Sequence, residues 1–125
     1  MNKHNKHLTA EQQRVIFEKG TEKPFSGTYN DHFESGIYAC ANCGAELFSS
    51  DKKFQSSCGW PAFFDEYKNI KKQTDLSAGM KRTEVICAQC SGHLGHVFSD
   101  GPKPTGLRYC INSAALAFIP IEENT

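Results

Sequence analysis

The hydrophobic pattern begins with a short helical segment that follows a polar tail. Residues 1–7 are almost entirely polar or basic, so we expect a disordered tail and a single domain over residues 8–125. Thr9 has the N-cap chemistry of a helix start, and Gln12 three residues later completes a capping box. The apolar positions around this start are Leu8, Val15, Ile16 and Phe17. Gly20 predicts the end of the helix.

The rest of the chain is dominated by extended segments. "GIYACANCGAELF" and "TEVICAQCSGHLGHVF" each have the form of a strand, a tight turn and a second strand. The expected strands lie in residues 36–48, 83–98, 106–112 and 115–121. Pro120 has no amide hydrogen, which indicates that the last strand lies at a sheet edge. Residues 21–36 are rich in turn formers and predict a loop with brief strands. The fold class is therefore mainly β with a few short helices.

The charge balance argues against several classes of partner. The 125-residue chain has 14 lysines and arginines against 14 aspartates and glutamates, which favours neither a nucleic-acid backbone nor an anionic membrane surface. The longest apolar stretch, "AALAFIPI", is too short to span a bilayer. The N-terminal sequence lacks the apolar core of a signal peptide. We therefore expect a cytoplasmic protein with no nucleic-acid or membrane partner.

The six cysteines predict metal binding or redox chemistry, because stable disulfides are rare in the cytoplasm. Cys40 and Cys43 form one C-x-x-C pair, and Cys87 and Cys90 form a second. A two-residue spacer in a tight turn directs both thiolates at one ion. Two such turns supply the closed four-sulfur shell of a structural zinc site. The long interval between the pairs implies that the metal clips two distant hairpins together.

Other interpretations of these four cysteines stay open. A redox-active C-x-x-C normally opens a helix in a βαβ unit, whereas strand-like sequence flanks both pairs here. Four buried free thiols would leave the two equal spacings to chance. Iron fits the same sulfur shell as zinc. Because four thiolates leave no open coordination position, we expect the metal to be structural rather than catalytic.

The two remaining cysteines are candidates for chemistry. Alternation along "LRYCIN" puts three apolar residues on the core face of a strand, namely Leu107, Tyr109 and Ile111. Arg108, Cys110 and Asn112 then share the other face, where the guanidinium favours the nucleophilic thiolate of the cysteine. An inert buried cysteine is an equally open alternative. Cys58 stands alone in sequence, two residues before the only tryptophan, Trp60.

Two histidines stand close to the second C-x-x-C turn. His93 and His96 can donate protons near neutral pH, and they would face the same cleft as Cys110 if the metal holds this hairpin in place. Solvated histidines, backbone-capping histidines and zinc ligands are the alternatives, although four cysteines already fill a tetrahedral shell. Trp60 on its own is equally compatible with a packing aromatic.

Together these motifs resemble the peptide-methionine (R)-S-oxide reductases, the B class of methionine sulfoxide reductases. The matching segments are "LTAEQQRVIFEKGTEKPFSGTYNDHFESGIYACANCGAELF", "KFQSSCGWPAF", "GMKRTEVICAQCSGHLGHVFSDGP" and "PTGLRYCINSAAL". They cover nearly the whole chain in family order, and the trio of "CGWP", "GHLGHVF" and "RYCIN" is highly specific. Departures are small, since Ser57 stands where glycine is common and Ala62 stands where serine is common.

The resemblance implies a role for each candidate residue. Cys110 corresponds to the catalytic nucleophile and Cys58 to the resolving cysteine. Trp60 resembles the aromatic that packs on the substrate methyl group, and Arg108 resembles the residue that keeps the thiolate ionised. The polar cluster around the sulfoxide oxygen corresponds to His93, His96 and Asn112. The four zinc ligands correspond to Cys40, Cys43, Cys87 and Cys90.

The resemblance also implies a fold and an activity. The family fold is two antiparallel sheets with a few short helices, which zinc clips together. The activity is reduction of the R epimer of methionine sulfoxide, mainly in proteins. It proceeds through a Cys110 sulfenic acid and a Cys110–Cys58 disulfide that thioredoxin reduces. We therefore expect a monomeric cytoplasmic enzyme that repairs proteins under oxidative stress.

Two other functions fit part of the sequence. A non-catalytic zinc-ribbon module that binds protein or RNA explains the four metal cysteines, but it gives Cys58 and Cys110 no role and requires a basic face. A thiol peroxidase would use the same cysteine cycle as the reductase. A count of reactive thiols distinguishes the zinc ribbon from the enzyme. An assay that compares peroxide with methyl sulfoxide as substrates distinguishes the peroxidase from the reductase.

Overall fold

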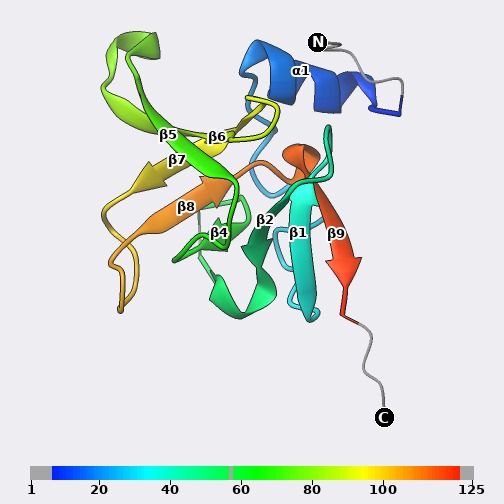
Figure 1. The fold of residues 1–125 in the computed structure, drawn as a ribbon. Helices are drawn as coiled ribbons and strands as arrows, with labels where there is room; N and C mark the ends of the chain where they lie inside the picture. The colour runs from blue at the N-terminus through cyan, green and yellow to red at the C-terminus, as the bar shows by residue number, and fades with distance from the viewer. Residues whose placement is uncertain (1–6, 57, 122–125) are drawn as a thin grey trace.

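The computed structural model describes residues 7–56 and 58–121, and this part of the chain contains one α-helix, α1 (Ala10–Glu18), and nine strands. The strands are β1 (Gly36–Cys40), β2 (Glu46–Ser49), β3 (Lys53–Phe54), β4 (Ala62–Phe63), β5 (Ile70–Asp75), β6 (Arg82–Cys87), β7 (His93–Phe98), β8 (Arg108–Ile111) and β9 (Leu116–Pro120). The short 3₁₀ helices are η1 (Ser50–Lys52), η2 (Ser77–Gly79) and η3 (Ser113–Ala115). The mainly β fold class is confirmed (Figure 1).

Helix α1 begins as its sequence predicts. The Thr9 hydroxyl accepts a hydrogen bond from the Gln12 amide (3.1 Å), and the Gln12 side chain accepts one from the Thr9 amide (2.8 Å), which completes the capping box. The helix ends in a left-handed residue at Lys19, with φ of 54°, just before the expected glycine. Its buried side chains are Val15 and Ile16. The helix packs against η3 and β7.

A three-stranded antiparallel sheet has the order β2-β1-β9. Strand β1 is central, because it pairs with β2 on one side and with the C-terminal strand β9 on the other. The β1–β2 pair is the first hairpin predicted from the sequence. Gly36 at the start of β1 faces Pro120 at the end of β9. Strand β9 is thus an edge strand, as the proline indicates.

A six-stranded antiparallel sheet has the order β3-β4-β8-β7-β6-β5. The second predicted hairpin, β6–β7, lies inside it, and β8 pairs with β7. Strand β5 was not expected from the sequence. It pairs with β6 over six residues, yet only Asp75 of β5 is buried, so its sequence has no hydrophobic alternation. The two antiparallel sheets expected from the family resemblance are both present.

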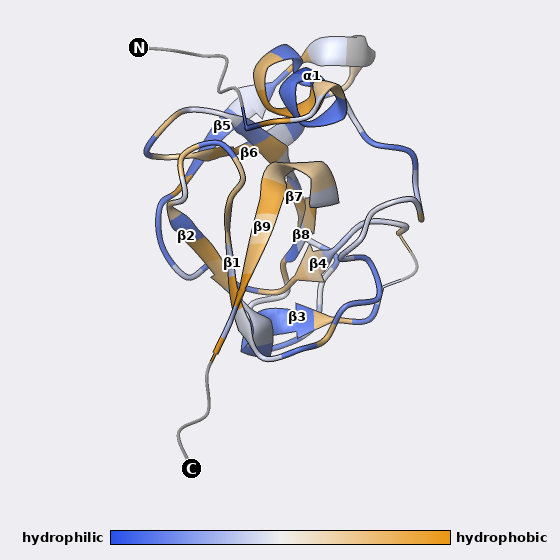
Figure 2. Cartoon of the chain, turned by 90° about the vertical axis from the view of Figure 1, so that its right-hand side faces the viewer, coloured by the Kyte–Doolittle hydropathy of each residue, from blue (hydrophilic) through white to orange (hydrophobic). Residues whose placement is uncertain are grey.

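Aromatic side chains from both sheets fill the space between them. Tyr38 and Phe48 come from the smaller sheet, Phe63 and Tyr109 from the larger one, and none is more than 1% exposed. The rings of Phe48 and Phe63 stack with centroids 4.4 Å apart. Full burial of each such side chain contributes about 1.5–3 kcal/mol. Figure 2 shows β9 as a largely hydrophobic strand and β3 as a mostly hydrophilic one.

The segment between α1 and β1 differs from the expectation. Residues 21–35 form turns and loop, and none of these described residues lies in a strand. The loop is held by long-range bonds instead, such as that from the Phe25 amide to the Gly59 carbonyl (2.7 Å). The tail expected for residues 1–7 lies outside the described residues except for His7, whose Nε2 donates to the Ala41 carbonyl (2.7 Å).

The helices of the described residues are short. The longest of them, α1, has nine residues, and none has the length and apolar character that a membrane-spanning helix requires.

Candidate active site

The register of the six-stranded sheet places His96 directly opposite Cys110. His96 on β7 pairs with Cys110 on β8, and Cys110 pairs in turn with Ala62 on β4. On its other side His96 pairs with Glu84 on β6. Directly opposite residues of antiparallel strands share a face, with Cβ atoms about 4.5–5.5 Å apart. One face of the sheet therefore carries a carboxylate, an imidazole and a thiol in a row.

The close approach of β7 and β8 requires glycine at position 95. A Cβ added to Gly95 would lie 2.1 Å from the Cys110 carbonyl oxygen, much closer than any real contact. A larger residue would therefore push the two strands apart. Gly95 thus fixes the distance between the strand that carries His96 and the strand that carries Cys110.

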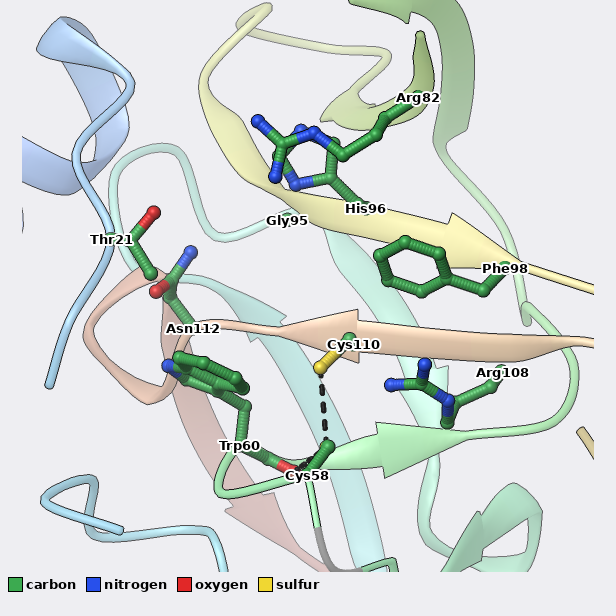
Figure 3. A pocket seen from close by; sticks show the side chains of 10 residues that line it. All are labelled: Thr21, Cys58, Trp60, Arg82, Gly95, His96, Phe98, Arg108, Cys110 and Asn112. Atoms are coloured by element: carbon green, nitrogen blue, oxygen red, sulfur yellow. Dashed lines mark hydrogen bonds between the residues drawn. The ribbon is translucent and has the colours of Figure 1, made fainter. Parts of the chain in front are cut away.

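A cavity of about 290 Å³ opens over this face of the sheet (Figure 3). Six residues expected at the site line it, namely Cys58, Trp60, His96, Arg108, Cys110 and Asn112. The rest of the lining consists of Thr21, Arg82, Gly95 and Phe98. Figure 3 shows the Trp60 and Phe98 rings on either side of Cys110. Two aromatic walls, a thiol and nearby donors suit a small apolar group that carries a polar oxygen.

Cys58 and Cys110 are in contact in the reduced protein. The Cys110 thiol donates to Cys58 Sγ over 3.2 Å. This bond lowers the pKa of Cys58 to about 5, although burial opposes the shift. The same bond, together with burial, raises the pKa of Cys110. The pair therefore loses its first proton readily and holds the second one, which the two sulfurs share.

Arg108 is fixed beside the two thiols. Its Nε and Nη2 donate to the two carboxylate oxygens of Asp100 at 2.9 and 3.2 Å, and its guanidinium lies 4.6 Å from the centroid of the Phe98 ring. Its positive charge favours the thiolate of both Cys58 and Cys110. In each case this influence is smaller than that of the hydrogen bond between the thiols.

Trp60 and Asn112 are held in place by the same residue of the loop after α1. The Trp60 Nε1 donates to the Glu22 carbonyl (3.0 Å), and the Glu22 amide donates to Asn112 Oδ1 (2.9 Å). Asn112 Nδ2 donates to the Leu94 carbonyl (3.0 Å). This loop closes one side of the cavity and places Thr21 in its wall (Figure 3).

The two histidines reach the same face of β7 because the strand is irregular. Residues three positions apart in a regular strand point to opposite faces. Here Val85 pairs with Gly95 and Ile86 with His93, so Leu94 is an extra residue that turns the strand. The His93 and His96 rings consequently lie with their centroids 5.4 Å apart.

His93 lies behind the cavity wall, not in it. Its side chain is only 3% exposed, and its Nδ1 donates to Glu84 Oε2 (2.7 Å). Burial lowers its pKa, although the Glu84 carboxylate opposes this. His93 is thus absent from the lining of this cavity, whereas His96 reaches it, and the place of His93 around the sulfoxide oxygen stays a prediction.

The four remaining cysteines meet where the two sheets approach each other. Their Sγ atoms all lie within 4.8 Å of one another. Cys40 and Cys90 are 3.7 Å apart, and Cys43 and Cys87 are 3.5 Å apart. Tetrahedral zinc with Zn–S bonds of about 2.3 Å separates its sulfurs by about 3.8 Å. The four residues therefore fit a zinc ion and join the β1–β2 turn to the β6–β7 turn.

The two C-x-x-C turns have the same local structure. In the first, the Gly44 amide donates to the Cys40 carbonyl (2.9 Å), and in the second the Ser91 amide donates to the Cys87 carbonyl (2.8 Å). Gly44 and Ser91 both adopt positive φ, at 81° and 65°. The repeated spacing in the sequence thus produces a repeated turn that presents two sulfurs to one point.

Sequence reasoning missed several residues around the site, namely Thr21, Asp75, Arg82, Glu84, Phe98 and Asp100. Alternation along β6 and β7 could have indicated some of them, because it places Arg82 on the same face as Glu84 and Phe98 on the same face as His96. Asp75 gave no such signal, since β5 lacks a hydrophobic pattern.

Comparison with known proteins agrees with this geometry. Residues 8–120 match the SelR domain family. A protein of Leptospira interrogans is 56% identical over 115 residues, which cover 90% of this chain and 88% of the relative. A protein of Methanosarcina mazei is 55% identical over 118 residues, which cover 93% of this chain and 84% of the relative. Both relatives carry the name peptide methionine sulfoxide reductase MsrB.

Proposed function

Because this chain belongs to the SelR domain family, we infer that it is a peptide-methionine (R)-S-oxide reductase, like the relatives named peptide methionine sulfoxide reductase MsrB. The proposed reaction reduces the R epimer of methionine sulfoxide, mainly in proteins, to methionine. The observation that carries the inference is the 3.2 Å contact between the Cys110 and Cys58 sulfurs in a cavity walled by Trp60 and Phe98.

Cys110 is the proposed nucleophile. Its thiolate attacks the sulfoxide sulfur, the sulfoxide oxygen takes up a proton, and the oxygen passes to the cysteine sulfur. Methionine leaves after gaining two electrons, and Cys110, which has lost two, becomes a sulfenic acid. Trp60 and Phe98 offer apolar walls to the substrate methyl group. His96 lies on the same face and supplies a hydrogen bond or proton to the oxygen.

The thiol pair contributes to the ionisation of its own nucleophile. In the resting pair the shared proton lies on Cys110, while Cys58 has the lowered pKa. Attack by Cys110 therefore requires this proton to move to Cys58, which is already its hydrogen-bond acceptor. Arg108 stabilises the negative charge wherever it lies in the pair.

Cys58 is the proposed resolving residue. Its thiol condenses with the Cys110 sulfenic acid, so that an S–S bond forms and water leaves. Because a disulfide needs sulfurs about 2.05 Å apart, the resting pair has to close by only about 1 Å. A dithiol donor such as thioredoxin then reduces the disulfide by exchange and restores both thiols.

Zinc is the proposed ion at the four-cysteine cluster. Cys40, Cys43, Cys87 and Cys90 would hold it, and their geometry supports a closed tetrahedral shell. Four thiolates leave no position for substrate, so the site stabilises the fold and takes no part in the reaction.

The proposed setting is protein repair under oxidative stress in the cytoplasm. A reducing compartment keeps the six cysteines free of stable disulfides, which suits two thiols that react and four that bind a metal. We propose that the protein works as a monomer.

One assay tests the reaction directly. The purified protein, with dithiothreitol as reductant, is given the separate R and S epimers of a blocked methionine sulfoxide, and hydrogen peroxide in a parallel sample. We expect turnover of the R epimer alone and none with the Cys110→Ser variant. Faster consumption of peroxide than of the R epimer would assign the protein to the thiol peroxidases instead.

A further inference from the structure

Two buried carboxylates are paired with the two histidines of β7. His96 Nε2 lies 2.7 Å from Asp75 Oδ2, and His93 Nδ1 lies 2.7 Å from Glu84 Oε2. Both carboxylates are only 2% exposed. Asp75 comes from the edge strand β5, so it reaches across β6 to contact the imidazole. Neither carboxylate contacts the thiol pair that carries out the proposed reaction.

The other oxygen of each carboxylate is surrounded by hydrogen-bond donors. Asp75 Oδ1 accepts from the Ser77 amide (3.0 Å) and lies 3.4 Å from Lys19 Nζ. Glu84 Oε1 accepts from Gln73 Nε2 (2.9 Å) and lies 3.3 Å from the same ammonium group. Lys19 therefore bridges the two histidine–carboxylate pairs from the end of α1.

The bridging lysine occupies an unusual position. Lys19 ends α1 in the left-handed region, with φ of 54°, where glycine is the common residue. A left-handed conformation is costly for a residue with a side chain. The contact of Lys19 with two buried carboxylates gives a physical reason for a lysine at this position.

These contacts fix the charge on the carboxylates. The hydrogen bond from His96 and that from the Ser77 amide hold the pKa of Asp75 well below its usual range. Burial opposes ionisation of Glu84, but hydrogen bonds from Gln73 and His93 outweigh it and lower its pKa. An ionised carboxylate only accepts hydrogen bonds, so the imidazole nitrogen that faces it must carry a proton.

We propose that Asp75 is a positioning residue that holds the Nε2–H of His96 and stabilises its imidazolium, in which Nδ1–H is the donor offered to the oxygen of the bound sulfoxide. This role rests on the proposed reaction, whereas the proton position itself does not. His96 is 13% exposed and lines the cavity, while its Nε2 is occupied by Asp75. The Glu84–His93 pair has the same design and fixes the neighbouring ring from behind.

Asparagine at position 75 would reverse the proton position. Its carbonyl oxygen is favoured at the place of Oδ1, because the Ser77 amide and the Lys19 ammonium both donate there. The NH₂ group then takes the place of Oδ2 and points at His96 Nε2, also facing Arg82 Nη2 at 3.5 Å. A nitrogen that accepts from an amide cannot keep its proton, so the proton moves to Nδ1.

The test is ¹⁵N NMR of the reduced holoprotein at about pH 8, above the ordinary histidine pKa of ~6.5. Long-range ¹⁵N–¹H spectra show which ring nitrogen carries the proton, and the His96 signals are assigned by their loss in His96→Asn. We expect a proton on Nε2 of His96 in the wild type and on Nδ1 in Asp75→Asn. A wild-type His96 with its proton on Nδ1 alone would overturn the proposal without any variant.

Glu84→Gln is the matched control. It should move the His93 proton from Nδ1 to Nε2 and leave His96 unchanged, because Gln73 and Lys19 orient the new amide in the same way. Asp75→Asn should leave His93 unchanged. An Asp75→Asn variant that is folded and keeps the Nε2 proton on His96 would contradict the proposed role.

Single-turnover reduction of the R epimer links the proton position to catalysis. Asp75→Asn should slow it by roughly 10²-fold or more, because a neutral amide no longer stabilises the imidazolium that gives its Nδ1 proton to the sulfoxide oxygen. Glu84→Gln should slow it less, because His93 lies behind the cavity. Equal rates in the wild type and Asp75→Asn, despite a shifted proton, would overturn the catalytic role of Asp75. A wild type that holds the Nε2 proton but reduces no sulfoxide would instead contradict the proposed function alone.

Discussion

The sulfurs of Cys58 and Cys110 lie 3.2 Å apart, although the two residues are 52 positions apart in sequence. The pairing of β4 with β8 brings the two segments together, because Ala62 lies directly opposite Cys110. Cys58 Sγ also lies 3.3 Å from the Trp60 carbonyl oxygen, so the thiol stays close to the aromatic wall of the cavity. A disulfide between these residues therefore requires only a local movement of the segment that carries Cys58.

The shared proton predicts an unusual pH dependence of alkylation. In the wild type, Cys58 should react with iodoacetamide with a midpoint near pH 5, because the bond from Cys110 lowers its pKa to about 5. In Cys110→Ala this donor is gone, so the midpoint should move up toward the ordinary thiol value of about 8.5. Peptide mapping after brief alkylation measures both profiles. The same midpoint in both proteins would show that the proton is not shared.

Replacement of Cys110 and of Cys58 should block the reaction at different steps. Cys110→Ser should form no methionine, because no nucleophile remains. Cys58→Ser should still form one methionine per enzyme, since the bond from Cys58 that raises the pKa of Cys110 is gone and Arg108 still favours the Cys110 thiolate. Turnover with thioredoxin should then stop, because thioredoxin attacks a disulfide, whereas dithiothreitol should restore some activity. Normal cycling of Cys58→Ser with thioredoxin would exclude Cys58 as the resolving residue.

Local sequence signals predicted the elements that form from neighbouring residues. The Thr9–Gln12 capping box and the two C-x-x-C hairpins appear where the sequence places them, because caps and tight turns depend on residues three or four positions apart. Strand β5 was missed because it is polar and takes its form from pairing with β6. Tertiary pairing, not propensity, decides such a strand.

The site was predictable only in part for the same reason. Alternation along β8 correctly put Arg108 and Cys110 on one face. The position of His93 was not predictable, because the extra residue at Leu94 reverses the faces that simple alternation would give. The contact between Asp75 and His96 crosses two strand pairings, so nothing local in the sequence indicates it.

The metal cluster should contribute mainly to folding. Serine at Cys43 should release the ion and lower the Tm by roughly 10 °C or more, because several kcal/mol of metal-binding energy are folding energy at such sites. Cys58→Ser is the control, since Cys58 lies outside the cluster and this variant should keep its metal. Elemental analysis and thermal melts measure both variants. Wild-type protein with no bound metal and six freely reactive thiols would show that the four cysteines do not form a metal site.

The buried carboxyl of Glu22, beside the cavity, should make the stability of the fold depend on pH. Glu22 is 3% exposed. One oxygen accepts from the Ala114 amide (2.8 Å), while its Oε2 has no hydrogen-bond partner among the described residues. Burial raises the pKa of this carboxyl above the ordinary value of 4.5. The folded protein therefore binds a proton here more tightly than the unfolded chain does.

The sign of the resulting pH dependence follows from linkage. Where the folded state binds more protons, stability falls as pH rises. The contribution of Glu22 is thus fully present below pH 4.5 and is lost as pH rises from there through the raised pKa of the folded protein. Glu22→Gln removes the titrating group and should flatten this decline, so that its advantage over the wild type grows from pH 4.5 toward neutrality.

Urea unfolding of the two proteins across this pH range measures the difference. The neutral amide no longer suffers the cost of a buried charge, and an unpaired buried acceptor typically costs about 1–3 kcal/mol. Glu18→Gln, at the exposed end of α1, is the control for loss of a carboxylate as such. Because Glu22 holds Trp60 and Asn112 through its backbone, the glutamine variant keeps those bonds. Parallel stability curves for wild type and Glu22→Gln would mean that the buried carboxyl is not protonated more readily in the fold.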